Sequence, residues 1–134
     1  MSAFLDTNVI ICHLRGEDLR VAERCRQLLA RAEDNAVELV TSELVIAEAV
    51  WVLQSQSGLP RELIRDYLMP IVRMPGLRIP NKSIWPSVFD LFCEKRVDFI
   101  DAYNAVAMKR AGVTQIYSYD RDFDKIEGIE RLTP

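Results

Sequence analysis

The chain has few glycines and no segment that resembles a flexible linker. Its 134 residues include five glycines, with no internal repeat and no low-complexity or Gly/Ser-rich stretch. A chain of this length is typical of one compact domain, which buries about two-thirds of the surface of its unfolded state. We therefore expect a single domain over residues 1–134.

Paired cysteines, long apolar runs and an export signal are also missing. Cys12, Cys25 and Cys93 are widely spaced, which predicts neither a disulfide framework nor a zinc site. No stretch approaches the ~20 apolar residues that a membrane-spanning helix needs. A strand-like apolar run begins by residue 3, which leaves no room for the parts of a signal peptide. We expect a cytoplasmic protein with reduced thiols and no membrane partner.

An excess of positive charge is absent as well. The chain has 17 Lys and Arg against 20 Asp and Glu, a net charge of −3. Proteins that bind nucleic acid by general electrostatic attraction depend on clustered Lys and Arg, which displace counterions from the phosphates. A nucleic-acid role for this chain therefore requires a local basic patch or a bound metal ion.

What the sequence does contain is a succession of short apolar strands and amphipathic helices. The predicted strands are "AFL", "VELV", "GLRIP", "TQIYSYD" and "IERL", and the predicted helices cover residues 20–34, 41–58, 60–72, 83–96 and 98–112. Such alternation predicts an α/β fold with a mainly parallel sheet and helices on both faces. Ligands of these sheets bind beyond the carboxyl ends of the strands, where the strand order reverses.

Two aspartates stand just past predicted strands. Asp6 follows "AFL" and Asp120 follows "QIYS". If the two strands are neighbours in the sheet, their carboxylates converge at its carboxyl edge. The alternative for each is a helix or turn cap, which aspartate also favours.

Glu48 is the one ionisable residue in the middle of a nearly continuous apolar segment. Residues 44–53 read "LVIAEAVWVL", which predicts a helix that is buried on most sides. A buried glutamate needs a partner, either a cation or a basic residue from another element. A carboxylate in a metal site meets that need.

Further acids stand at the start of the last long helix and in the turn after "QIYS". Asp98 and Asp101 occupy the expected N-cap and third positions of the helix, where capping alone accounts for both. Small residues follow Asp101, which favours close packing on the sheet and places this acid at its rim. Asp120 and Asp122 are two apart in "YDRDFD", and their spacing does not separate their roles.

The chemistry of these groups favours a hard cation. Carboxylates without neighbouring histidine or cysteine form an all-oxygen site, which selects Mg²⁺ or Mn²⁺ over zinc. His13 is the single histidine and has no nucleophile motif around it, and no glycine-rich nucleotide-binding loop is present. Metal-assisted attack by water is the reaction that remains.

Four segments in this order resemble the PIN-domain ribonucleases, and within them the VapC-type toxins of toxin-antitoxin pairs. They are "FLDTNVII", "VIAEAVWVL", "DFIDAYNAVAMKRAG" and "IYSYDRDFDKI", which span essentially the whole chain. The resemblance implies a three-layer α/β/α fold with strand order 3-2-1-4-5. It also implies a magnesium- or manganese-dependent endoribonuclease with one or two ions per site.

Carried over by position, the resemblance implies a set of roles. Asp6, Glu48 and Asp101 form the metal-binding core, completed by Asp120 or Asp122. Thr7, Asn8, Asp98 and Ser118 support these ligands, although Thr7 and Asn8 also suit a helix N-terminus. The family often has threonine where Ser118 stands and asparagine where Asp120 stands, which leaves the fourth ligand open. Candidates for guiding the substrate are Lys82, Lys109, Arg110 and Arg121.

The partners implied by the resemblance are an RNA substrate (tRNA, rRNA or mRNA), a small antitoxin protein and a second copy of the chain. One alternative is a nuclease that is not a toxin, and another is a PIN module that binds RNA or protein without cleaving. A haloacid-dehalogenase-like phosphatase has D-x-D-x-T at the position where this chain has "DTNVI", and a receiver domain needs acids that are missing here.

Overall fold

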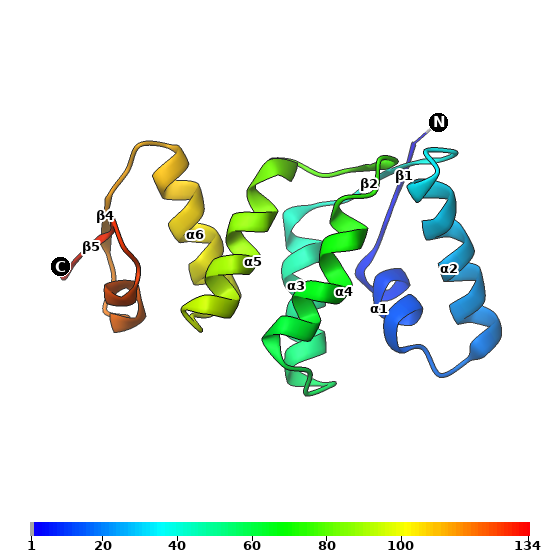
Figure 1. Cartoon of the computed structure of the whole chain (residues 1–134), viewed down its shortest axis with the longest axis horizontal. Helices are drawn as coiled ribbons and strands as arrows, with labels where there is room; N and C mark the ends of the chain where they lie inside the picture. The colour runs from blue at the N-terminus through cyan, green and yellow to red at the C-terminus, as the bar shows by residue number, and fades with distance from the viewer. Residues whose placement is uncertain (1) are drawn as a thin grey trace. The chain divides into compact units, whose positions relative to one another are not determined.

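The computed structural model of the chain describes residues 2–134. The chain forms two compact units, one up to Lys82 and one over Ser83–Pro134. Figure 1 follows the chain through both. None of the helices in the described range is long and apolar enough to cross a membrane.

The first unit is a three-stranded parallel sheet with four helices. Its elements are β1 (Ser2–Phe4), α1 (Thr7–Arg15), α2 (Leu19–Glu33), β2 (Glu38–Val40), α3 (Glu43–Ser55), α4 (Arg61–Val72) and β3 (Leu77–Arg78). β2 is the middle strand, with Ala3 opposite Leu39 and Leu39 opposite Leu77. Because the strands are parallel, the chain crosses back to the starting end of the sheet through helices before each new strand begins.

Helix ends in this unit are set by local chemistry. The Ser42 side chain accepts a hydrogen bond from the Val45 N–H at 3.2 Å, so α3 begins at the N-cap that the sequence predicts. Asp18 caps α2 by accepting from the Arg20 and Val21 N–H groups. The core beneath these helices is apolar, and its largest fully buried side chains include those of Ile10, Leu29, Ile46, Leu53, Ile64 and Leu68.

The second unit places two helices beside a two-stranded parallel sheet. Its elements are α5 (Trp85–Glu94), α6 (Phe99–Arg110), β4 (Gln115–Tyr117), the 3₁₀ helix η2 (Arg121–Lys125) and β5 (Glu130–Leu132), preceded by the short 3₁₀ helix η1 (Lys82–Ile84). Aromatic rings join α5 to α6: Trp85 stacks on Phe99 with ring centroids 6.0 Å apart, and Phe92 meets Phe99 edge to face at 5.5 Å.

The observed strands confirm an α/β chain with parallel pairing. The first sheet has the order 3-2-1, as predicted, and β4 pairs with β5 in a separate sheet. The structure therefore does not show the continuous order 3-2-1-4-5. Among residues 2–134, β1 pairs with β2 alone and β4 with β5 alone, so each of these strands has one unpaired edge.

The carboxyl end of β1 is fixed by a buried hydroxyl group. The Thr41 side chain is 2% exposed, and its hydroxyl donates to the Leu5 carbonyl at 2.8 Å. The Leu5 N–H in turn donates to the Val40 carbonyl at 2.7 Å. These two bonds hold the backbone just before Asp6.

We predict that Thr41→Val lowers the free energy of unfolding by about 1–2 kcal/mol, because it preserves the side-chain shape and removes the donor to a buried carbonyl. Chemical denaturation of the purified protein measures this change. Thr114→Val is the matched control, since Thr114 is exposed. Equal unfolding free energies for Thr41→Val and wild type would contradict the assignment.

Candidate active site

Asp6 lies at the N-cap position of α1 without capping the helix. Its backbone is extended, with φ −89° and ψ 157°, and its side chain is exposed and accepts no hydrogen bond from the helix N-terminus. The sequence left two alternatives for Asp6, a helix cap or a metal ligand, and the structure lacks the side-chain hydrogen bond that a cap usually makes. The carboxylate is therefore free to bind another group.

Two neighbours of Asp6 differ in their surroundings. Thr7, the first residue of α1, is 5% exposed, whereas Asn8 is exposed. Thr7 therefore belongs to the packed start of the helix, and Asn8 is accessible beside Asp6.

Glu48 lies on the exposed face of α3. The buried face of this helix carries Val45, Ile46, Ala49, Val50 and Leu53. The other face bears Leu44, which is 79% exposed, Glu48 and Trp51, which is 58% exposed. The expectation that Glu48 is buried was wrong, because apolar residues also occupy the exposed face and conceal the amphipathic character of the helix. Glu48 has no ion pair within the described residues.

Four acids of the second unit lie close together. Partial burial and the charges of Asp120, Asp98 and Asp122 raise the pKa of Asp101 to about 6 from its ordinary value of 3.8. A hydrogen bond between the Asp101 and Asp120 side chains contributes to this shift. Mutual repulsion of neighbouring carboxylates has this effect because one of them keeps its proton at higher pH.

Local hydrogen bonds hold the turn that carries Asp120. The Asp120 N–H donates to the Ser118 hydroxyl at 3.0 Å, and the Asp122 N–H donates to the Asp120 carboxylate at 2.9 Å. Asp120 is thus the N-cap of η2, while Asp122 forms an ion pair with Lys125 at 2.9 Å. Asp98 is at the N-cap position of α6 but accepts no capping bond. Because Asp122 already has a basic partner, Asp120 is the less neutralised of the two acids.

An ion pair at the end of the chain supports the same turn. Arg131 of β5 pairs with Asp124 at 3.0 Å and donates to the Ser118 carbonyl at 3.1 Å. Sequence reasoning did not identify Arg131 as a supporting residue. The only available signal was a basic residue in a predicted strand after an acidic turn.

Three of the four basic candidates make hydrogen bonds within the chain. Lys82 donates to the carbonyls of Met74 and Leu77 at 2.6 and 2.7 Å, and partial burial lowers the pKa of its ammonium group. Lys109 donates to the Glu127 carbonyl. Arg110 donates to the hydroxyl and carbonyl of Ser83, both at 2.9 Å. These hydrogen bonds connect all three side chains to carbonyl or hydroxyl groups elsewhere in the chain and account for them without a substrate.

Arg121 is the exception among the basic candidates. It is exposed at the start of η2 and makes no hydrogen bond or ion pair with its side chain among residues 2–134. It lies between Asp120 and Asp122 in the chain, next to the acidic group.

The donor set of the candidate site fits a hard cation. Within the described residues, no three Asp, Glu, His or Cys side chains converge closely enough to chelate an ion. The acids of the second unit are nevertheless near enough to raise the pKa of Asp101, and all of their donor atoms are oxygens. A divalent cation relieves such repulsion, and carboxylate oxygens are the ligands that Mg²⁺ and Mn²⁺ select.

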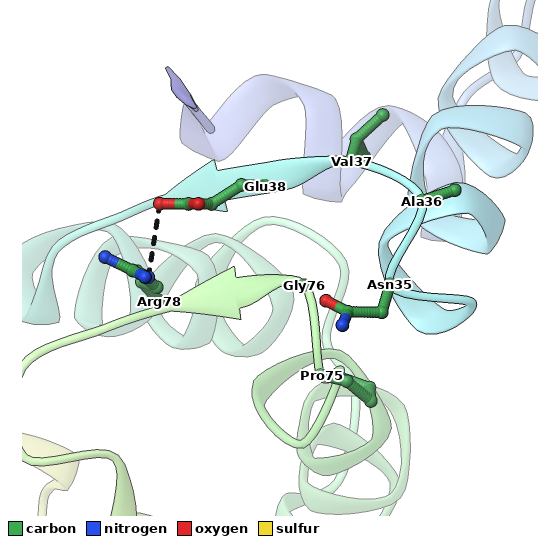
Figure 2. A pocket seen from close by; sticks show the side chains of 7 residues that line it. All are labelled: Asn35, Ala36, Val37, Glu38, Pro75, Gly76 and Arg78. Carbon is green, nitrogen blue, oxygen red and sulfur yellow. Dashed lines mark ion pairs between the residues drawn. The ribbon is translucent and has the colours of Figure 1, made fainter. Parts of the chain in front are cut away.

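A cavity in the first unit is lined by none of the candidate acids. It has a volume of about 640 Å³ and is lined by residues 35–38, Pro75, Gly76 and Arg78. Figure 2 shows it at the start of β2 and β3, with the Glu38–Arg78 ion pair of 3.2 Å across one side. Since β1 runs parallel to β2, Asp6 follows the opposite end of the sheet.

Comparisons with known proteins match nearly the whole chain. The model of the PIN domain family matches residues 3–129. A protein described as a VapC ribonuclease from Aquifex aeolicus (strain VF5) is 26% identical over 130 residues, which cover 97% of this chain and 95% of that protein.

We predict that the pKa of Asp101, measured by carboxyl ¹³C NMR titration without divalent cations, is about 6. Asp120→Asn lowers this pKa because it removes a negative charge and changes the shared hydrogen bond. Asp66→Asn, an equal charge change in the other unit, leaves it in place. Between about pH 4 and 6 Asp101 keeps its proton in the folded state and has lost it in the unfolded state. The contribution of Asp101 to the free energy of unfolding therefore becomes less favourable as pH rises through this range. An unshifted Asp101 would contradict the clustering.

Proposed function

The chain belongs to the PIN-domain family, and on that basis we propose that it is a metal-dependent ribonuclease that hydrolyses RNA phosphodiester bonds. The observation that carries the proposal is the group of carboxylates around Asp101, where burial and the neighbouring charges of Asp120, Asp98 and Asp122 together raise the pKa of Asp101. The proposal includes one PIN domain over residues 1–134, because the family match extends through both compact units.

The proposed ligands are Asp6, Glu48, Asp101 and Asp120, with Asp122 as the alternative fourth ligand. The exposed and unpaired carboxylates of Asp6 and Glu48 support this role. The proposal also includes the strand order 3-2-1-4-5, which brings the ends of β1 and β4 next to each other. The unpaired edges of these two strands support it, because free backbone donors and acceptors favour pairing with another strand.

Bound Mg²⁺ or Mn²⁺, as one or two ions, supplies a Lewis acid that lowers the pKa of the attacking water and offsets the charge that develops on the phosphate. The carboxylates of this chain orient the reacting groups and need not act as nucleophiles. Asn8, which is exposed two residues after Asp6, is the proposed hydrogen-bond donor to the Asp6 carboxylate or to a metal-bound water. Ser118 holds the backbone of Asp120, and Asp98 adds negative charge next to Asp101.

Asp101 also has a proton to lose before it can bind a cation. With a pKa of about 6 the side chain is largely ionised at neutral pH, and a nearby cation favours that ionised form further. Below pH 6 protons compete with the metal for this carboxylate. Metal affinity is therefore expected to fall in acid.

We predict that RNA cleavage by the purified protein requires Mg²⁺ or Mn²⁺ and stops in the presence of a chelator. Asp6→Asn, Glu48→Gln and Asp101→Asn each lower kcat/KM by about 100-fold or more, the scale for loss of one group that stabilises transition-state charge. Ser118→Ala lowers it by about tenfold through misplacement of Asp120. The substrates are separate pools of tRNA, rRNA and mRNA, with cleavage ends mapped.

Asp66→Asn is the control for these variants, because Asp66 is exposed on α4 and outside the acidic group. Circular dichroism establishes that each variant is folded. Cleavage that persists unchanged in Asp6→Asn contradicts the proposed site. If the wild-type protein binds RNA tightly but cleaves it in neither Mg²⁺ nor Mn²⁺, the chain is a PIN module that binds RNA without catalytic activity.

We further propose that the ribonuclease acts as the toxin of a toxin-antitoxin pair, functions as a homodimer in the cytoplasm and is inhibited by a small antitoxin protein. The similarity to a protein described as a VapC ribonuclease supports this role. The exposed apolar residues Leu44 and Trp51 beside Glu48 offer contact area for a protein that covers the acid.

Induced expression of the wild-type chain is predicted to arrest growth of a bacterial host, whereas Asp101→Asn expressed to the same level does not. Growth curves and total RNA from the two cultures measure the difference. Normal growth with wild-type protein that cleaves RNA in vitro identifies a nuclease that is not a toxin.

A further inference from the structure

Three arginines form a line along the solvent side of α2. Arg20, Arg24 and Arg31 are all exposed, and they are separated by four and seven residues. At 3.6 residues per turn these positions share one face, and the outer two are separated by roughly 16 Å along the helix axis. The opposite face carries the buried Cys25, Leu29 and Ala32. We call Arg20, Arg24 and Arg31 the arginine stripe.

Among the described residues, the side chains of the arginine stripe have no ion-pair partner, although the Asp18 carboxylate accepts a hydrogen bond from the Arg20 backbone N–H at 3.0 Å. None of the three side chains makes an ion pair or hydrogen bond with any residue in the described part of the chain. Glu23, the acid nearest to the stripe on the helix, is bound by Arg26 at 2.6 and 2.8 Å and by Gln27 at 3.2 Å. The stripe therefore presents three free guanidinium groups to solvent.

The stability of α2 explains Arg31, which lies in the last turn, where the helix dipole favours positive charge, but it does not explain Arg20 and Arg24. Arg20 lies in the first turn, where the helix dipole disfavours positive charge. Arg20 and Arg24 are four residues apart, a spacing at which like charges repel. At Arg20 and Arg24 the sequence thus places positive charge where an isolated helix would be more stable without it, and a ligand of opposite charge would relieve both costs.

We propose that the arginine stripe is a docking surface for the phosphate backbone of single-stranded RNA, an inference that rests on the proposed ribonuclease function. The chain has a net charge of −3, so it needs a local basic patch to hold RNA. Lys82, Lys109 and Arg110 make hydrogen bonds within the chain, whereas the stripe does not.

The position of α2 supports this assignment. α2 packs along α1 at the edge of the first unit (Figure 1), and α1 begins directly after Asp6. RNA bound along α2 is therefore held by the same unit that carries one of the proposed ligands. Guanidinium groups match phosphate oxygens geometrically, and a line of them follows a strand without reading its bases.

The test measures binding of a fluorescein-labelled 20-nucleotide polyuridine to the full-length protein in Mg²⁺. Every protein tested carries the Asp101→Asn substitution, which prevents cleavage of the RNA. Adding R20A, R24A and R31A is expected to weaken binding about tenfold or more at low salt. The slope of log K against log salt is expected to fall by about 2, because single strands contribute about 0.7 per phosphate contact. The melting temperature is expected to stay level or rise.

The matched control removes the same charge elsewhere, with R73A, R78A and K95A on other elements of the chain. This control is expected to change affinity less than twofold. Equal weakening by both triple variants, or no weakening by the stripe variant, overturns the inference. Competition by polyglutamate as effective as that by unlabelled RNA also overturns it, since the stripe would then favour an acidic protein.

A parallel assay with active protein separates this inference from the proposed function. The stripe variant is expected to raise KM for RNA while kcat stays unchanged. If wild-type protein cleaves RNA and the stripe variant has the same KM, the ribonuclease function stands and the docking surface is wrong. If RNA binds through the stripe but no metal supports cleavage, the docking surface stands and the nuclease activity is wrong.

Discussion

The placement of a partly buried carboxylate, Asp101, among other carboxylates is the constraint on which the candidate site depends. Asp101 lies near Asp120, Asp98 and Asp122, and partial burial together with these charges raises its pKa to about 6. A fold stabilised only by its own contacts would gain by separating or pairing these groups. The divalent cation that we propose for this PIN-domain chain would offset the negative charge around Asp101. Asp6 and Glu48, which have no partners among the described residues, supply oxygens of the same kind.

Ordinary secondary structure positions these acids. The strands are short, and Asp6 stands beyond the carboxyl end of β1, where Thr41 fixes the preceding carbonyl. Asp101 is in the first turn of α6, where favourable interaction with the helix dipole accommodates an acid. Asp120 heads η2, and the Ser118 hydroxyl and Arg131 hold that turn from the two strands. Each acid therefore sits at the end of a rigid element, which limits its movement when a ligand binds.

Local sequence signals predicted much of this arrangement, and long-range contacts account for what they missed. The cap at Ser42 and the parallel strands follow from spacing and residue type. The grouping of Asp120 with Asp101 was predicted only through the resemblance to PIN-domain ribonucleases. The exposure of Glu48 was missed because Leu44 and Trp51 disguise an exposed helix face. The hydrogen bonds of Lys82 and Arg110 depend on how turns fold back, which residue type does not specify. The arginine stripe was hidden by the acidic net charge of the chain and by Glu23, which stands between Arg20 and Arg24.

Mn²⁺ binding to the full-length protein, measured by calorimetry at pH 7.5, tests the central claim most directly. The account predicts that wild-type protein binds one or two ions per chain and that Asp6→Asn and Asp101→Asn each weaken binding by at least about tenfold, the scale for loss of a metal-site group. Asp66→Asn is expected to bind as wild type does. Retention of wild-type affinity by Asp6→Asn or by Asp101→Asn would contradict a shared metal site.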